Sequence, residues 1–234
     1  MDLAVLGRSA IALVLALALP ALAGCDAAEP DTASENAAPS VPLGTGFDFY
    51  VLALSWSPSY CAALGDRANR QQCESRDPHA FVVHGLWPQY ERGYPADCPT
   101  QRPLSVPRSL SDTMLDIMPS TGLVRHQWRK HGTCTGLSQS AYFEVTRAAH
   151  ERVVIPDAFQ TGEAYANPDP GSVEAAFLAA NDGLKAGAVA VTCDRRFLRE
   201  VRICLSKDLT GFVSCPEVDR NACALPTAAM PAAQ

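Results

Sequence analysis

Runs of apolar residues predict strands near both ends of the chain. Residues 47–56 (FDFYVLALSW) and 80–86 (AFVVHGL) are rich in aromatic and β-branched side chains, a pattern that is typical of buried strands. Shorter runs at 188–193, 201–205 and 212–215 predict three further strands.

Apolar residues at helical spacing fill the stretch between these strands. They predict helices over residues 108–118, 123–133, 138–153 and 172–181. Because helices occupy the middle of the chain and strands its two ends, the pattern predicts an α+β fold, with a central antiparallel β-sheet and several helices packed against it.

Residues 1–25 have the pattern of a signal peptide. The apolar run at 11–22 is too short to span a bilayer as a helix. Two alternatives stay open for the end of this segment. One is ordinary cleavage after Ala23, and the other is the lipobox-like sequence LAGC at 22–25, in which Cys25 is lipidated and becomes the mature N-terminus.

The rest of the chain divides by composition into three parts. Residues 26–46 are rich in Ala, Pro, Ser and Thr, which predicts a flexible linker. Residues 47–223 contain the periodic segments and form the expected folded domain. Residues 224–234 are an Ala/Pro stretch without periodicity, which predicts a disordered tail.

Composition and charge limit the function classes. The chain has 234 residues, of which 47% are hydrophobic, so it can bury the core of one domain and is not a disordered protein. The formal net charge is −6, which excludes a global positive field around the protein. Any binding to nucleic acid must therefore rest on a local patch of cations.

The cysteine count indicates the compartment. There are nine cysteines, and removing Cys25 leaves eight, which can pair fully and so favours its lipidation. Export predicts disulfides, whereas the wide spacings without a Cys-x-x-Cys pair argue against a zinc site. We expect a periplasmic or extracellular protein, with a lipid on Cys25 as its one link to a membrane.

Segment 125–134 (RHQWRKHGTC) carries the densest chemistry. If it is helical, His126 and Lys130 share one face with Gln127 and His131, because both pairs are four residues apart. Neighbouring cations lower histidine pKa values, so a neutral imidazole is available here as a base. A solvated charged helix face is the alternative. Metal binding is disfavoured, since the histidines are five residues apart and the segment has no acidic residue.

A further histidine lies in the predicted strand 80–86. His84 precedes a Gly and the Trp87-Pro88 break. Taken alone, such a histidine is more often a satisfied core residue, and Trp87 is more often part of the core than a stacking platform for a base.

Together the two segments resemble the ribonuclease T2 family. The resemblance covers residues 47–223 and rests on HGLWP at 84–88 and on H-x-W-x-K-H-G-T-C at 126–134. It implies a ribonuclease T2-like fold with four disulfides. The implied pairs are Cys61–Cys73, Cys98–Cys134, Cys193–Cys223 and Cys204–Cys215.

The resemblance also implies a mechanism. The chain would be an endoribonuclease that cleaves single-stranded RNA to 2′,3′-cyclic phosphate ends and then hydrolyses these to 3′-phosphates, with no metal or other cofactor. His131 would be the general base and His84 the general acid, while Lys130 stabilises the transition state and His126 holds the phosphate. The family usually has Glu at the position of Gln127. An amide can only hydrogen-bond, so the role of this residue is open.

Base recognition is expected to be broad. Trp87 and Tyr94 are candidates for the first base pocket, because stacking tolerates every base. Gln89 stands where some family members have an Asp that selects the base, and Ser55 stands where many have a Gln that contacts the second base. RNA is the expected partner, and no obligate protein partner is implied.

Three other functions compete with this interpretation. A catalytically weakened, RNA-binding family member is supported by Gln127 and by the acidic net charge. A metal-dependent phosphodiesterase would be inhibited by EDTA. A purely structural lipoprotein would leave the two motifs unexplained.

Overall fold

The computed structural model describes residues 41–163, 165 and 167–233. The predicted signal peptide at 1–25 and the lipidation of Cys25 lie outside the described residues. So does the predicted linker up to residue 40. Among the helices that are described, none is both long and apolar enough to cross a membrane.

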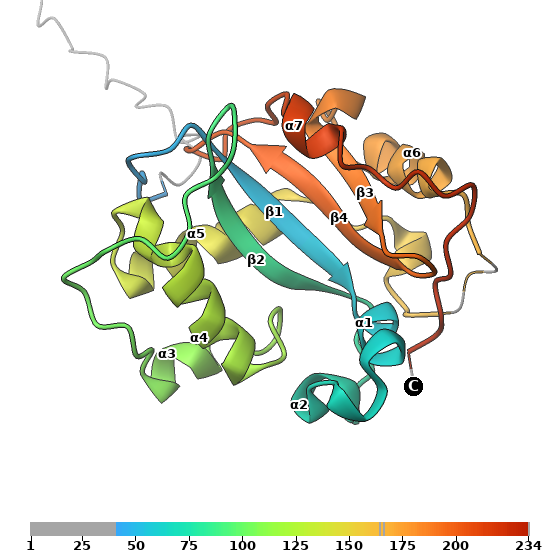
Figure 1. Ribbon diagram of the computed structural model, residues 1–234, viewed down its shortest axis with the longest axis horizontal. Coiled ribbons are helices and arrows are strands. Elements are labelled where there is room, and N and C mark those ends of the chain that lie inside the picture. Colours follow the sequence, from blue (N-terminus) through green and yellow to red (C-terminus); the bar gives the residue numbers. More distant parts are fainter. Residues whose placement is uncertain (1–40, 164, 166, 234) are drawn as a thin grey trace, which may run out of the picture. The chain divides into compact units, whose positions relative to one another are not determined.

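An antiparallel four-stranded sheet forms the centre of the domain (Figure 1), in the order β2-β1-β4-β3. The strands are β1 (Phe49–Trp56), β2 (Phe81–Gln89), β3 (Val189–Cys193) and β4 (Leu198–Leu205). This architecture confirms the predicted α+β class with a central antiparallel sheet.

The helices lie between β1 and β3 in the sequence, with a short one after β4. They are α1 (Ser57–Leu64), α2 (Arg70–Cys73), α3 (Arg108–Asp112), α4 (Thr121–Lys130), α5 (Gln139–Arg152), α6 (Pro170–Ala180) and α7 (Pro216–Asp219). Short 3-10 helices occupy Gly65–Arg67, Gly132–Thr135, Asp157–Phe159 and Ala186–Ala188.

Two predicted helices are shorter in the structure. The helix expected over 108–118 ends at Asp112, and the Thr113 hydroxyl beyond it donates to the carbonyl of Leu110 over 2.8 Å. The helix expected over 123–133 ends at Lys130, where the chain tightens into a 3-10 helix. Helices commonly end early where a side chain competes for backbone hydrogen-bonding groups, or where the last turn becomes a 3-10 helix.

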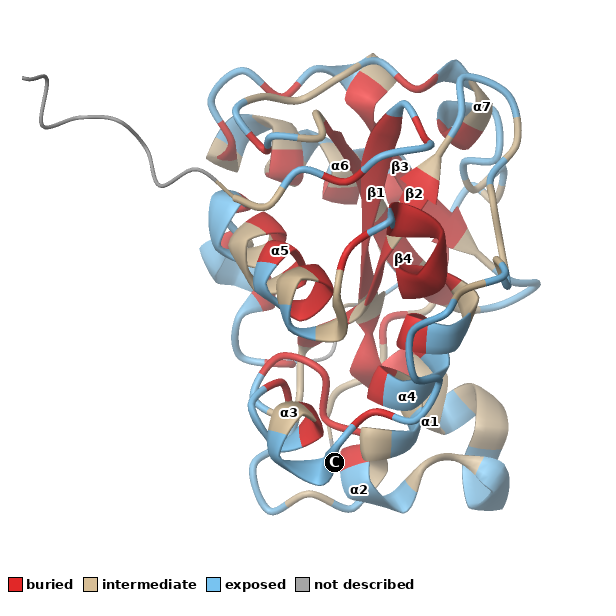
Figure 2. Cartoon of the chain, turned by 90° about the vertical axis from the view of Figure 1, so that its left-hand side faces the viewer, coloured by how far each residue is buried: buried red, intermediate tan, exposed pale blue. Residues whose placement is uncertain are grey.

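Both faces of β1 are buried, which explains why its sequence is nearly continuous in apolar residues. Tyr50, Leu52 and Leu54 point into the main core, which α5 and α6 cover. Phe49 and Val51 point to the opposite face, into a smaller apolar cluster beside α7. Figure 2 shows the sheet nearly edge-on, with α5 on one side and α7 on the other.

One irregularity in the sheet decides which side chains share a face. Ala53 pairs with Gly85, whereas the next residue, Leu54, pairs with Val83. His84 is therefore the extra residue of a β-bulge. Without the bulge, strict alternation from Leu86 would direct His84 into the main core. With it, Val83 joins the main core and His84 lies on the opposite face, with Trp87.

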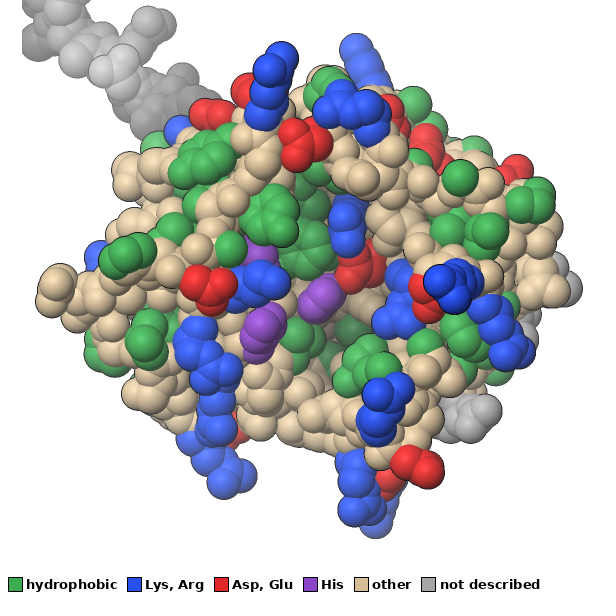
Figure 3. Space-filling view, viewed as in Figure 1, with side chains coloured by type: hydrophobic (Ala, Val, Ile, Leu, Met, Phe, Trp, Pro, Cys, Tyr) green, Lys and Arg blue, Asp and Glu red, His purple; other side chains and the backbone are tan. Residues whose placement is uncertain are grey.

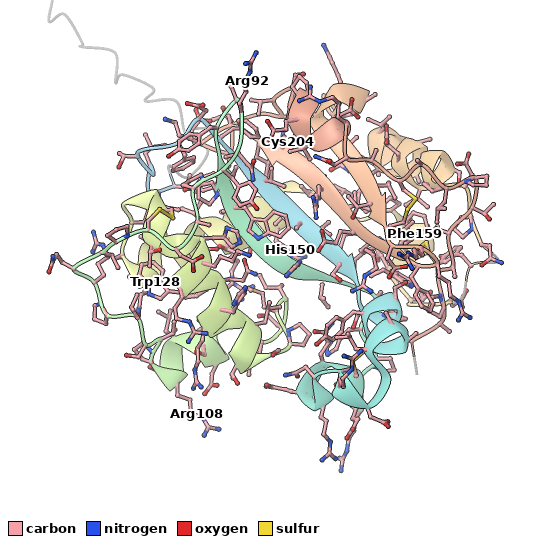
Figure 4. All side chains as sticks on the ribbon, viewed as in Figure 1. Arg92, Arg108, Trp128, His150, Phe159 and Cys204 are labelled. Atoms are coloured by element: carbon pink, nitrogen blue, oxygen red, sulfur yellow. A yellow bond between two sulfur atoms is a disulfide. The ribbon has the colours of Figure 1, made fainter. Side chains whose placement is uncertain are left out.

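All four disulfides implied by the resemblance are present. They are Cys61–Cys73, Cys98–Cys134, Cys193–Cys223 and Cys204–Cys215. Cys98–Cys134 ties the long loop after β2 to the turn that follows α4. Cys204, labelled on β4 in Figure 4, ties the strand to the start of α7. Cys61–Cys73 joins α1 to α2, so not every disulfide involves the sheet.

The predicted ends of the domain need correction. Residues 224–234 were expected to form a disordered tail, yet Met230 is fully buried and pairs with Tyr165, and the Trp56 indole donates to the carbonyl of Pro231 over 2.9 Å. At the other end, the backbone of Thr45 donates to Thr135 over 2.9 Å, so residues 41–46 belong to the domain rather than to a linker. These contacts are long-range, and local composition does not encode them.

Two predicted strand boundaries also differ. β4 begins at Leu198 rather than at residue 201. The strand expected over 212–215 is reduced to a single bridge between Phe212 and Leu205, because the backbone of Cys215 donates to Gly187 instead.

We predict that Met230→Ala destabilises the domain by about 2–5 kcal/mol, the usual cost of emptying a buried Met site. Urea denaturation followed by circular dichroism measures this. Val154→Ala is the control, because Val154 is 52% exposed and its truncation should cost under about 0.5 kcal/mol. Equal stabilities of the two variants would show that the tail contributes nothing to the core.

Candidate active site

A cavity of about 280 Å³ opens on the sheet face that carries His84. It is lined by Val51, His84, Trp87, Gln89, Tyr94, His126, Gln127, Lys130, His131, Arg202, Glu217, Val218 and Asn221. Figure 3 shows histidine side chains gathered on this face, beside basic and acidic ones. Both predicted motifs thus contribute to one cavity.

β2 supplies His84 and Trp87. Their rings meet edge to face, with centroids 5.3 Å apart. The His84 side chain is 35% exposed, so it is not the satisfied core histidine that the sequence also allowed. The bulge is what turns this ring toward the cavity.

α4 brings the second motif to the same place. Its N-terminus is capped by Ser120, whose hydroxyl accepts from the backbone of Leu123 over 3.2 Å. Gln127 is 1% exposed and His131, the residue that ends the helix, is 6% exposed. These two residues are therefore not part of a solvated charged face, which was the alternative interpretation.

His131 lies in an apolar environment. Its ring stacks on Trp87, with centroids 5.4 Å apart and planes 25° from parallel. Its Nδ1 atom is buried and has no hydrogen-bond partner among the described residues. Burial, followed by the charge of Lys130, lowers the pKa of His131 to about 3. The sequence predicted this direction, but it attributed the shift to cations rather than chiefly to burial.

Gln127 holds Trp87 in place. Its Oε1 atom accepts from the indole Nε1 over 2.9 Å. Gly85 permits this contact, because a Cβ there would overlap Gln127 Oε1 and lie 2.5 Å from Trp87 Nε1. The Gln127 amide thus positions an aromatic ring.

Two nitrogen-bearing side chains, Lys130 and His126, lie in the C-terminal half of α4. Lys130 is half-buried, and its backbone carbonyl accepts from Asp97, next to the Cys98–Cys134 disulfide. His126 is largely exposed. Its remaining burial, followed by the charges of Lys130 and His84, lowers its pKa. The disulfide therefore anchors this positive patch to the loop that carries Tyr94.

Sequence analysis missed two charged residues on β4, Glu200 and Arg202. Glu200 Oε1 lies 2.5 Å from Nδ1 of His84, and Glu200 Oε2 accepts from Arg202 Nε over 2.9 Å. The Arg202 guanidinium also lies over the Trp87 ring, 5.1 Å from its centroid. They were missed because the strand was expected to begin at residue 201, although a charged pair two residues apart on a strand shares one face.

The predicted base-binding residues divide between two cavities. Trp87, Gln89 and the 58% exposed Tyr94 line the first. Ser55 lines a second cavity of about 390 Å³, which shares His84 and His126 with the first. His84 and His126 thus line both cavities. In the described part of the chain, no group of three or more His, Cys, Asp or Glu side chains is placed to hold a metal ion.

Comparison with known proteins identifies the family. A family model described as "Ribonuclease T2 family" matches residues 47–215. The chain belongs to the ribonuclease T2 family. A ribonuclease of Aeromonas hydrophila is 36% identical over 187 residues, covering 73% of this chain and 77% of that protein. Ribonuclease I of Escherichia coli is 26% identical, covering 69% of this chain and 76% of that protein.

Solved structures agree on the fold of this T2 ribonuclease. RNase NT in complex with 5′-AMP superposes with a TM-score of 0.60 at 24% identity, covering 80% of this chain and all (100%) of that one. An RNase-related protein from Calystegia sepium gives a TM-score of 0.61 at 20% identity, covering 81% and 100%. The family match and the similarity to the Aeromonas hydrophila ribonuclease establish a ribonuclease T2-type endoribonuclease.

We predict that Gly85→Ala lowers cleavage of RNA by at least about tenfold while the fold remains, because the new methyl group separates Trp87 from Gln127. Activity assays and the near-ultraviolet circular dichroism of the tryptophans measure the two effects. The matched control is Gly171→Ala in α6, where a Cβ meets its nearest atom at 3.5 Å. Wild-type turnover in Gly85→Ala would exclude a need for this contact.

Proposed function

We propose that this enzyme cleaves single-stranded RNA by transphosphorylation, forming 2′,3′-cyclic phosphate ends without a metal ion. The observation that carries the proposal is the contrast between two histidines on one cavity. His131 is buried against Trp87 without a charged hydrogen-bond partner, while His84 is paired with a carboxylate. Pairs of titratable groups in opposite environments mark the base and the acid of a reaction.

His131 acts as the general base. Its low pKa keeps the imidazole neutral at physiological pH, so it can take the proton of the ribose 2′-hydroxyl. Because Nδ1 is buried, Nε2 is the nitrogen that a substrate reaches. The 2′-oxygen then attacks the adjacent phosphorus atom, as the chemistry of RNA permits.

His84 acts as the general acid. The carboxylate beside Nδ1 holds the ring, and the protonated imidazole can donate its other proton to the leaving 5′-oxygen. Lys130 stabilises the additional negative charge of the transition state, and His126, between the two cavities, holds the phosphate. In a second step the histidines exchange roles, and water opens the cyclic phosphate to a 3′-phosphate.

Base preference is broad in this proposal. Trp87 and Tyr94 offer aromatic surfaces to the base on one side of the scissile bond, with Gln89 beside them. Ser55, in the second cavity, contacts the base on the other side. A small hydroxyl and an uncharged amide select weakly among bases.

We further propose that the enzyme works outside the cytosol. The four disulfides persist in an oxidising compartment, which suits the periplasm or the extracellular space. Lipidation of Cys25 would anchor it to a membrane. Mass spectrometry of the mature N-terminus distinguishes a lipidated Cys25 from simple cleavage after Ala23.

We predict that purified protein cleaves single-stranded RNA in excess EDTA and releases fragments with 2′,3′-cyclic phosphate ends. End-group analysis by mass spectrometry, sampled over time, should show these ends before 3′-phosphates. Loss of activity in EDTA would support a metal-dependent phosphodiesterase. RNA binding without cleavage would support the catalytically weakened family member.

We predict that His84→Ala and His131→Ala each reduce kcat by about 10²–10⁴-fold, the usual contribution of one acid or base. The wild-type rate should stay high on the acid side of neutrality, because the pKa of His131 is about 3 and its imidazole stays neutral there. The matched control is His150→Ala, since His150 lines neither cavity. Wild-type turnover in either active-site variant would overturn the assignment.

A further inference from the structure

We propose that Glu200 is a positioning residue for this reaction: it holds the His84 ring by Nδ1, so that Nε2 faces the leaving oxygen. The inference rests on the proposed function of His84 as the general acid. It assigns to β4 the carboxylate that Gln127, as an amide, does not provide.

The sheet register brings Glu200 to His84. On β4, Glu200 lies opposite Ser55 of β1, and Arg202 lies opposite Ala53. Gly85 of β2 flanks Ala53 on the other side. Because β1 carries small side chains at these two positions, residues from β2 and β4 meet above the central strand.

Glu200 is set up to remain ionised. It is only 8% exposed, and its two oxygens have different partners, Oε1 with His84 and Oε2 with Arg202. Burial alone would raise the pKa of Glu200, but the hydrogen bond and charge of His84, together with Arg202, lower it to about 2. A buried carboxylate with paired oxygens is a fixed negative charge throughout the neutral range.

Two other side chains of the cavity, Gln127 and Glu217, could accept a hydrogen bond from His84, but both are bonded elsewhere. Gln127 is neutral, and its Oε1 atom accepts from Trp87. Glu217 lines the same cavity, but both of its oxygens accept from the backbone of Gly93, at 3.0 and 3.1 Å. Among the described residues, Glu200 is the acid that contacts an active-site histidine.

Positive charge from two elements lies around His84. Lys130 of α4 and Arg199 and Arg202 of β4 line its two cavities. The other titratable groups that line them are Glu217, Tyr60, Tyr94, His126 and His131, and Glu200 is the acid that contacts the His84 ring.

Glu200→Gln tests the charge separately from the shape, because an amide oxygen can still accept from Nδ1. We expect kcat for RNA to fall by at least about tenfold, with KM nearly unchanged, since Glu200 orients a catalytic group and does not need to touch RNA. Glu200→Ala, which removes the acceptor as well, should lose more activity.

Asp116→Asn is the matched control. Asp116 also pairs with an arginine, Arg147, at 2.7 Å, but it lies outside both cavities. Its removal should change neither kcat nor KM. A Glu200→Gln enzyme with wild-type kcat would overturn this inference and leave the ribonuclease proposal intact. A wild-type enzyme that forms no 2′,3′-cyclic ends would overturn both.

A measurement on the wild-type protein removes any dependence on the folding of a variant. Long-range ¹⁵N–¹H NMR at alkaline pH reports which nitrogen of neutral His84 carries the proton. We expect the Nδ1–H tautomer, because Glu200 accepts at that atom. The Nε2–H tautomer would overturn the inference independently of any rate measurement.

Discussion

β2 has one residue more than the part of β1 with which it pairs, and that residue is His84. The site depends on this mismatch in register. Because of it, Val83 and Leu86 can both enter the main core while His84 and Trp87 share the opposite face. A bulge of this kind interrupts the ladder locally, and the many apolar contacts on both faces of the sheet hold it in place.

Because of the same mismatch, His84 and His131 line one cavity but have different surroundings. His84 meets a carboxylate from β4, whereas His131 meets the face of an indole at the end of α4. Burial and the charge of Lys130 keep the His131 ring neutral. The sheet and α4 thus place two residues of the same type in different surroundings, and the proposed mechanism assigns them the roles of acid and base.

The sequence predicted much of this site, because its chemistry is concentrated in two short motifs. It predicted the α+β class from apolar periodicity, and the resemblance supplied the four disulfides. It missed Glu200, because local pattern placed the start of β4 three residues late. The sequence also predicted a disordered tail around Met230. That prediction was wrong because the segment is held by contacts with Trp56 and Tyr165, which are far away in the chain. The contacts of Met230 leave no short-range signal, whereas Glu200 is only two residues from Arg202, with which it pairs.

The Cys98–Cys134 bond makes completion of the cavity wall depend on redox chemistry. The loop that carries Tyr94 joins α4 through this covalent link and through the bond from Asp97 to Lys130. A newly made chain with free thiols lacks the covalent half of that attachment, so its loop retains the conformational freedom that the bridge removes. Oxidation of Cys98 and Cys134 therefore coincides with completion of the cavity wall, so the reduced chain lacks a fixed position for Tyr94.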